Sequence, residues 1–265
     1  MTKLPLSICI VAGNEAQRIA RTLDSVQGWT GEIVIAIDDQ VTDGTDKIAA
    51  TYGAKIFSQP WSGHAAHRNF ASSHATQPWL LALDADEVIP PALREEIIAA
   101  LTNEKKASPP DAYSFPRCTS FGGRWIRHGD WYPDRKVRLW RRGQAHWDGK
   151  YLHEKLMVNG RIESLHSDLL HYSMDNLDHY VRKTITISNL FVRQKLERKQ
   201  SVSGLEMWAR PWWRFVRGYV LRRGFLDGWQ GYAIARMVAF ETFLRYTKVR
   251  EAQLLQAGNP PPPRP

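Results

Sequence analysis

Trp79-Leu80-Leu81-Ala82-Leu83-Asp84-Ala85-Asp86-Glu87 is the stretch around which the chain is organised. Its first five residues are apolar and its end is acidic, which predicts a buried strand that reaches solvent at its C-terminal end. Residues two apart on a strand point to the same side. We therefore expect Asp84 and Asp86 to project together into the crevice beyond the strand tip, where open α/β sheets bind ligands.

Two neighbouring carboxylates repel each other unless a positive charge lies between them. A hard divalent cation, Mg²⁺ or Mn²⁺, that itself holds substrate phosphates would meet that need. The same residues also fit a solvated strand end that leads into a helix, with Glu87 at the start of the helix. Asp-x-Asp is too common a pattern to decide between the two interpretations by itself.

The residues before this stretch alternate between apolar runs and helical periodicity. Strands are predicted at 6–11, 31–37 and 54–57, and helices at 19–26, 47–52 and 65–74. This alternation predicts a doubly wound parallel sheet. Because its connections are right-handed, the ends of the first, second and fourth strands face one crevice, where Asn14-Glu15 and Asp38-Asp39 join the acids described above. No glycine-rich dinucleotide fingerprint or Walker sequence is present, which disfavours hydride transfer and ATP hydrolysis.

The second half of the chain has a different pattern. Short runs at 113–115, 137–140 and 155–158 predict a smaller mixed sheet, where an acceptor could sit against the first half. Long helices are expected at 176–198 and 205–250, with breaks at Gly204, Pro211 and Gly224. The proline-rich end, 259–265, is expected to be disordered.

Charge is distributed unevenly along the 265 residues. The net charge is +9, yet residues 182–250 hold 15 Lys and Arg against 4 Asp and Glu, whereas residues 1–181 hold 20 against 22. Two distant cysteines, Cys9 and Cys118, suggest neither a metal pair nor a disulfide framework. With no signal peptide and no long apolar span in the sequence, we expect a cytoplasmic location.

Aromatic and basic residues alternate over 208–223. On a helix, such aromatics can enter the acyl boundary while the arginines meet lipid phosphates. The pattern therefore predicts peripheral attachment to an anionic membrane surface. A helix that packs on the catalytic domain with a basic outer face is the alternative.

Several motifs taken together resemble the family 2 glycosyltransferases of the GT-A fold. In the first half these are Asn14-Glu15, Ile37-Asp38, Thr42-Asp43-Gly44-Thr45, Arg68-Asn69 and Asp84-Ala85-Asp86. In the second half, Trp131-Tyr132-Pro133-Asp134-Arg135, Leu139-Trp140-Arg141-Arg142-Gly143, His153-Glu154-Lys155-Leu156 and Leu170-His171-Tyr172-Ser173 look like the bacterial lipopolysaccharide-core glucosyltransferases. The resemblance implies a mostly parallel central sheet flanked by helices, with a C-terminal helical extension.

The resemblance also implies roles for individual residues. Asp38 would receive the nucleotide base or ribose, Asp84 the ribose or the metal, and Asp86 the Mg²⁺ or Mn²⁺ that bridges the diphosphate. Glu154 would be the general base that takes the proton of the acceptor hydroxyl. Asp130 and Asp134 are the next candidates for the base.

Other residues have two interpretations each. Asn14 and Glu15 bind the base of the donor or form a strand-to-helix turn, and Arg68 binds a phosphate or ribose or is a solvated charge. Arg135 and Arg138 bind the diphosphate or an anionic acceptor, or are ordinary strand charges. His153 and His171 are candidate metal ligands or structural hydrogen-bonders.

We expect an inverting hexosyltransferase that uses a nucleotide-diphosphate sugar, with a UDP-sugar favoured. Its acceptor would be a glycan or glycolipid at the inner face of the cell membrane, and no nucleic acid partner is expected. Residues 1–175 would form the catalytic domain, with 1–110 on the donor side and 111–175 on the acceptor side, followed by a membrane-associating region at 176–257 and a tail at 258–265. A sugar nucleotidyltransferase and a non-catalytic nucleic-acid-binding module remain as alternatives.

Overall fold

In the computed structural model the described residues are 3–102, 109–149, 154–173, 177–256 and 258. Contacts group the chain into two compact units. One comprises residues 1–119 and 134–173, and the other comprises 120–133 and 174–265. Residues 120–133, which the sequence analysis assigned to the catalytic domain, thus group with the C-terminal helices. Nearly all of the predicted proline-rich tail lies outside the described residues.

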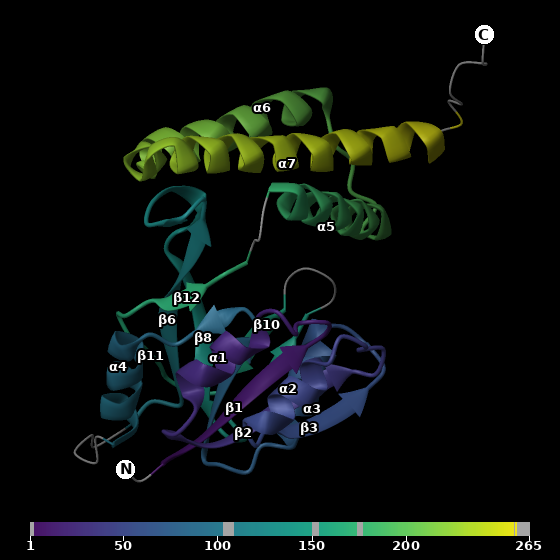
Figure 1. Ribbon diagram of the computed structural model, residues 1–265. Helices are drawn as coiled ribbons and strands as arrows, with labels where there is room; N and C mark the ends of the chain where they lie inside the picture. Colours follow the sequence, from purple (N-terminus) through teal and green to yellow (C-terminus); the bar gives the residue numbers. More distant parts are fainter. Residues whose placement is uncertain (1–2, 103–108, 150–153, 174–176, 257, 259–265) are drawn as a thin grey trace. The chain divides into compact units, whose positions relative to one another are not determined.

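The first unit contains most of the strands, with helices packed beside them (Figure 1). Its strands are β1 (Leu4–Ala12), β2 (Thr30–Asp38), β3 (Lys55–Gln59), β4 (Trp79–Asp84), β5 (Glu87–Val88), most of β6 (Ala112–Phe121), β8 (Asp134–Arg141), β9 (Ala145–Asp148), β10 (Lys155–Val158), β11 (Ile162–Ser164) and β12 (Leu169–His171). Its helices are α1 (Ile19–Val26), α2 (Thr45–Thr51), α3 (His64–Ser73) and α4 (Pro91–Thr102).

One large sheet runs through this unit in the order β3-β2-β1-β4-β8-β6-β12-β5, with β11 also beside β6. Strands β1 to β4 are mutually parallel, as predicted, whereas β8 is antiparallel to both of its neighbours. The predicted smaller sheet is only partly present. β6 and β8 join the main sheet, and β9 and β10 alone form a separate hairpin. The carboxyl ends of β1, β2, β4, β6 and β12 therefore lie at one edge.

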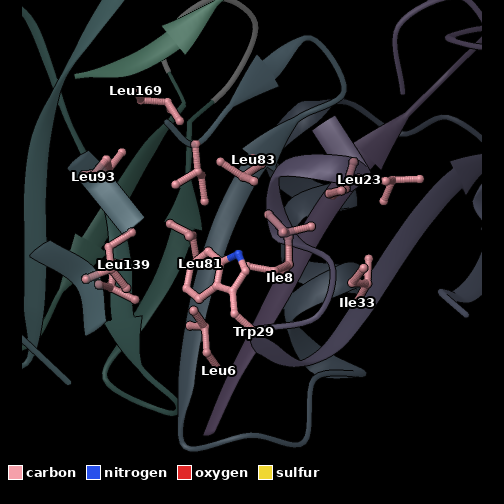
Figure 2. Packing of buried hydrophobic residues seen from close by; sticks show 14 of the residues in the cluster. Leu6, Ile8, Leu23, Trp29, Ile33, Leu81, Leu83, Leu93, Leu139 and Leu169 are labelled. Atoms are coloured by element: carbon pink, nitrogen blue, oxygen red, sulfur yellow. The ribbon is translucent and has the colours of Figure 1, made fainter. Parts of the chain in front are cut away.

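Burial on both faces explains why the strands read as continuous apolar runs. On one face Leu6, Ile8 and Leu81 pack with Leu23 of α1 and Leu93 of α4 (Figure 2). The opposite face is built from smaller side chains, among them Val34, Ala36, Leu80 and Ala82, which pack with Ala71 of α3. These residues alternate strictly along β2 and β4, so each strand contributes to both layers.

The second unit is mainly helical. It contains β7 (Arg124–Trp125), the turn η1 (Gly129–Trp131), α5 (Leu177–Glu197), α6 (Gly204–Val216), the π-helical turn η2 (Arg217–Leu221), the turn η3 (Gly224–Asp227) and α7 (Gly228–Gln256). α7 packs along both α5 and α6. Within the described residues, no helix is long and apolar enough to span a bilayer.

The predicted helix break at Pro211 is wrong, because α6 runs through that residue. The Ser203 hydroxyl and the Glu206 carboxylate form a reciprocal capping box that fixes the start of the helix. The helix instead changes geometry at η2 and stops before η3. There Gly231 lies so close to the Gly224 carbonyl oxygen that a Cβ atom would be 1.8 Å from it.

Candidate active site

The loops that follow β1 and β2 are tied together at the carboxyl edge of the sheet. The Asn14 side-chain oxygen accepts from the Thr42 N–H at 3.1 Å, and the Glu15 N–H donates to the Thr45 hydroxyl at 2.8 Å. Asp43 accepts from the Ala16 N–H at 2.9 Å and from the Thr45 N–H at 3.0 Å. Asn14 and Asp43 therefore hold the shape of this corner, and the predicted contact of Asn14 and Glu15 with a nucleobase remains a prediction.

Asp38 is the last residue of β2 and is partly exposed at the same edge. One of its oxygens accepts from the Gln40 N–H at 3.2 Å, which forms the turn after the strand. This position agrees with the predicted role in donor binding, although it does not test that role.

Asp84 ends β4, and Asp86 lies beyond it in a turn. The expectation that both carboxylates share one face of a strand is therefore wrong, because the strand stops between them. Asp84 receives two guanidiniums, from Arg68 at 2.5 Å and from Arg138 at 3.1 Å. Its charge is thus compensated by arginine rather than by a cation placed between two aspartates.

Asp84 belongs to a larger buried ionic cluster. Its members are Arg68, Arg117 and Arg138 with Asp84, Glu87 and Asp134. Burial alone would raise the pKa of the Asp84 carboxyl, but the guanidiniums of Arg68, Arg138 and Arg117 hold it well below its usual range. The site therefore contains a permanently ionised carboxylate in a fixed orientation.

Glu87 is the centre of this cluster, and the expectation that it starts a helix is wrong. It lies in β5, is fully buried, and accepts from Arg117 at 3.1 Å and from Arg138 at 3.3 Å. Its other oxygen accepts from the Asp84 N–H at 2.9 Å. Glu87 therefore positions both the backbone and the partners of Asp84.

The guanidiniums of Arg68 and Arg138 also contact Trp147. Their central carbons lie 4.6 Å and 5.7 Å from the centre of the indole ring. Arg68 Nε and Nη1 and Arg138 Nη1 are buried without a hydrogen-bond partner. The aromatic face compensates part of that cost through a cation–π interaction. Both arginines thus position Asp84, and their predicted contacts with donor or acceptor remain a prediction.

Asp86 is paired with His171, the last residue of β12. His171 Nε2 lies 3.5 Å from Asp86 Oδ2, and His171 Nδ1 lies 3.2 Å from the Thr119 hydroxyl. The Tyr172 N–H donates to the Asp86 carbonyl at 2.9 Å, which fixes the turn that carries the carboxylate. Pairing of β12 with both β6 and β5 brings these residues together from distant parts of the sequence.

This pair fits a divalent cation by the chemistry of its donors. A carboxylate oxygen and an imidazole nitrogen suit Mn²⁺, and the Thr119 contact can hold the tautomer that leaves Nε2 free to coordinate. Among the residues that the structure describes, no group of three His, Cys, Asp or Glu side chains is arranged to hold a metal. Two protein ligands are sufficient only if substrate phosphates complete the coordination, as is usual for Mg²⁺.

Glu154 is described and partly exposed, whereas His153 lies outside the described residues. Burial lowers the pKa of His64, and the negative charge of Glu154 acts in the opposite direction. Asp84 also raises the His64 pKa, while Arg68 lowers it. Glu154 therefore lies within electrostatic reach of His64, as do members of the buried cluster. Its predicted role as the base is not tested by this arrangement.

Arg135 contacts neighbouring backbone, and its predicted binding of the diphosphate or of an anionic acceptor remains a prediction. Its Nη1 donates to the carbonyls of Leu165 at 2.8 Å and Ser114 at 3.3 Å. The Arg135 guanidinium thus links β8 to the backbone of β6 and to the backbone after β11. Trp61 is 44% exposed and packs on the rings of His64 and His67.

Sequence reasoning missed Arg117, Glu87, Thr119 and Trp147 as parts of the site. Arg117 could have been found from its position in the apolar strand β6. An arginine is rarely buried without a partner, so its presence there indicates a nearby carboxylate. Glu87, directly after Asp86, offered no such signal.

The parallel sheet with acidic residues at its carboxyl edge has the architecture of the GT-A fold. Residues 7–155 match the sequence profile described as glycosyl transferase family 2, and the chain belongs to that family. It is an enzyme of the glycosyltransferase class. The sugar nucleotidyltransferase and non-catalytic alternatives are therefore set aside.

Proteins that are similar over nearly the whole chain are also named glycosyltransferases. An uncharacterized glycosyltransferase of Rickettsia typhi is 28% identical over 94% of this chain and 88% of its own length. The lipopolysaccharide core biosynthesis glycosyltransferase LpsC of Rhizobium meliloti is 28% identical over 96% of this chain and 95% of its own length. Among solved structures, the mannosyltransferase PcManGT of Pyrobaculum calidifontis, in complex with GDP-Man and Mn²⁺, superposes with a TM-score of 0.55. It is 13% identical and covers 96% of this chain and 89% of its own, so it shows the fold alone.

Proposed function

We propose that the chain is an inverting, divalent-metal-dependent hexosyltransferase. It moves a hexose from a nucleotide-diphosphate sugar, preferably a UDP-sugar, to a lipid-linked or lipopolysaccharide-core glycan. The observation that carries the proposal is the Asp86–His171 pair, 3.5 Å apart, beside a carboxylate that arginines keep ionised. The name of the LpsC relative supports the acceptor class, and the GDP-Man and Mn²⁺ of PcManGT support the donor class and the metal.

The residues at the carboxyl edge have complementary roles in this proposal. Asn14, Glu15 and Asp38 line the corner where the nucleoside would bind, and Asp84 would accept hydrogen bonds from ribose hydroxyls. Asp86 and His171 would hold Mg²⁺ or Mn²⁺, which supplies positive charge to the diphosphate of the departing nucleotide. Arg68 and Arg138 act indirectly, because they fix the orientation of Asp84.

The transfer step needs one base. The acceptor oxygen attacks the anomeric carbon, and the bond from that carbon to the phosphate oxygen breaks with its electron pair on the nucleoside diphosphate. The acceptor proton passes to a carboxylate oxygen of Glu154. Glu154 is preferred over Asp134, because the carboxylate of Asp134 is held by Arg117.

We also propose that the reaction occurs at the cytoplasmic face of the bacterial membrane. Soluble nucleotide sugars and a bilayer-anchored acceptor meet there. The basic surplus of residues 182–250 supports this location.

A donor screen tests the proposal. Thermal stability is measured with each sugar nucleotide in the presence and absence of Mn²⁺ or Mg²⁺, and the best donor is then incubated with lipopolysaccharide-core acceptors. We expect one nucleotide sugar to stabilise the chain only with metal, and nucleoside diphosphate to be released with transfer. Release of pyrophosphate, or stabilisation that is independent of metal for every donor, would contradict the proposal.

A further inference from the structure

Helix α6 exposes its apolar side, while Arg214 near its end and Arg217 just after it turn toward a buried carboxylate of the same unit. Leu205, Trp208 and Trp212 recur at i, i+3 and i+7, so they form one stripe along the helix. Their exposed fractions are 77%, 79% and 66%, and Trp213 beside them is half exposed. None of the residues of α6 is buried. Large apolar side chains are rarely this exposed together on a soluble protein unless something covers them.

The basic residues of the same helix form a second stripe. Arg210, Arg214 and Arg217 recur at i, i+4 and i+7, and at about 100° per residue they lie nearly opposite the tryptophans. Their side chains contact the rest of the second unit. Arg217 donates to Asp130 Oδ1 at 2.6 Å, and Arg214 Nε lies 3.7 Å from Asp130 Oδ2.

Asp130 is 3% exposed and anchors this inward orientation. Arg210 lies over the ring of Tyr246 on α7, with 5.2 Å from its central carbon to the ring centre. A surface helix of a soluble protein usually has the reverse arrangement, with apolar residues inward and charges outward. The contacts of the arginines therefore fix the tryptophan stripe on the outside.

Exposed apolar residues continue into the segment between α6 and α7. They are Val220, Leu221, Phe225, Leu226 and Trp229, each between 47% and 63% exposed. Two exposed arginines are interleaved with them: Arg222, whose Nη1 lies 3.4 Å from Asp130 Oδ1, and Arg223. The turn thus combines apolar and basic groups in the manner of segments that lie at a lipid headgroup boundary.

We propose that the α6 stripe (Leu205, Trp208, Trp212 and Trp213) and the α6–α7 turn (residues 220–229) dock the chain onto an anionic phospholipid bilayer. Indole rings are suited to the boundary between headgroups and acyl chains, because one part of the ring is apolar and the N–H is polar. The excess of 15 basic over 4 acidic residues in 182–250 complements negative lipid. No described helix can cross a bilayer, so the helix would lie in the membrane surface.

The charge also argues against a second copy as the occupant. A two-fold interface brings the same surface patch of both chains together. Arg222 and Arg223 of both chains would then lie in one shared patch, which would concentrate positive charge there. An anionic bilayer satisfies both the apolar and the basic groups.

Vesicle co-sedimentation of the full chain tests the proposal without donor or acceptor, so its outcome is independent of the transferase activity. Vesicles contain three parts phosphatidylcholine to one part phosphatidylglycerol, and phosphatidylcholine alone serves for comparison. We expect Trp208→Ser with Trp212→Ser to weaken binding by at least about tenfold. Arg222→Gln with Arg223→Gln should weaken binding to the anionic vesicles by about tenfold or more and leave binding to phosphatidylcholine nearly unchanged.

The matched control is Trp61→Ser, which removes a partly exposed tryptophan of the first unit and should leave binding unchanged. Circular dichroism and urea unfolding establish that each variant is folded. Absence of binding by the unmodified chain, or unchanged binding by the tryptophan variant, overturns the proposal. A dimer that becomes monomeric in the tryptophan variant, without any effect on vesicles, would assign the stripe to contact between copies. A shift with RNA but not with vesicles would assign it to nucleic acid.

Discussion

Replacing Glu87 by glutamine should destabilise the first unit strongly, although the side chain barely changes in shape. Glu87 is fully buried and accepts three hydrogen bonds, from the Asp84 N–H, Arg117 and Arg138. The amide keeps one acceptor oxygen but removes the negative charge. The guanidiniums of Arg117 and Arg138 would then face one negative charge fewer.

The size of the effect follows from the partners that remain. Breaking a buried ion pair by removing one partner costs about 3–5 kcal/mol. Arg117 still has Asp134 and Arg138 still has Asp84, so we expect the lower end, about 3 kcal/mol. For a unit of this size that corresponds to a fall in Tm of about 6–12 °C.

Urea unfolding followed by circular dichroism measures this change, with Glu95→Gln on the exposed side of α4 as the control. The control should change the free energy of unfolding by less than about 0.5 kcal/mol. In a double-mutant cycle, Arg138→Met should cost less in the Glu87→Gln background than alone, by about 1 kcal/mol or more. A loss below about 1 kcal/mol for Glu87→Gln would refute the reasoning that this carboxylate holds the cluster together.

Three further predictions concern other parts of the chain. Glu154→Gln should lower kcat by about 10²- to 10⁴-fold, as expected for loss of a general base, while the donor Kd measured by calorimetry stays near its original value. Burial would raise the pKa of Glu32, but hydrogen bonds from Lys55, Ser7 and Thr76 lower it to about 2. Because the pKa of Glu32 is lower in the folded than in the unfolded chain, the ionised carboxylate stabilises the fold at pH values above the unfolded-state pKa. Glu32→Gln should therefore lower the free energy of unfolding in urea by about 2–3 kcal/mol at pH 7. This difference should disappear as the pH falls from about 4.5 to about 2. Gly231→Ala should destabilise the second unit by about 1–3 kcal/mol in urea unfolding, because its Cβ would meet the Gly224 carbonyl oxygen.

Each of these has a result that would contradict it. A Glu154→Gln enzyme with a near-normal rate would move the base to another residue. A stability difference at Glu32 that does not depend on pH would remove the charge from the explanation. Gly204→Ala, where a Cβ would meet nothing, is the control for Gly231→Ala. Equal stability of the two glycine variants would contradict the close packing at Gly224.

Local pattern was sufficient to predict the parallel part of the sheet. β1, β2 and β4 are apolar runs because both faces of each are covered, and the runs end where the chain reaches the site. The same logic placed Asp38 and Asp84 at strand ends. The prediction that Asp86 continues the strand was wrong, because a turn follows Asp84. Tyr172, which is distant in sequence, donates a backbone hydrogen bond to the Asp86 carbonyl and stabilises that turn.

The electrostatic design of the site could not be predicted in this way. Arg138 and Arg117 face Asp84 because β8 and β6 enter the sheet antiparallel to each other, and no local pattern encodes that pairing. In the second unit Arg214 of α6 and Arg217 of η2 turn toward Asp130, which is far away in sequence and buried. In both places a non-local carboxylate decides which way an arginine points.

We propose that Asp86 and His171 bind a divalent cation during glycosyl transfer. The most direct measurement is the turnover of Asp86→Ala with the best donor over a range of Mn²⁺ concentrations, with urea unfolding as the check on the fold. We expect a loss of at least about a hundredfold in kcat at every Mn²⁺ concentration, with unfolding unchanged. Turnover equal to that of the unmodified enzyme, or full activity of the unmodified enzyme in excess chelator, would contradict it.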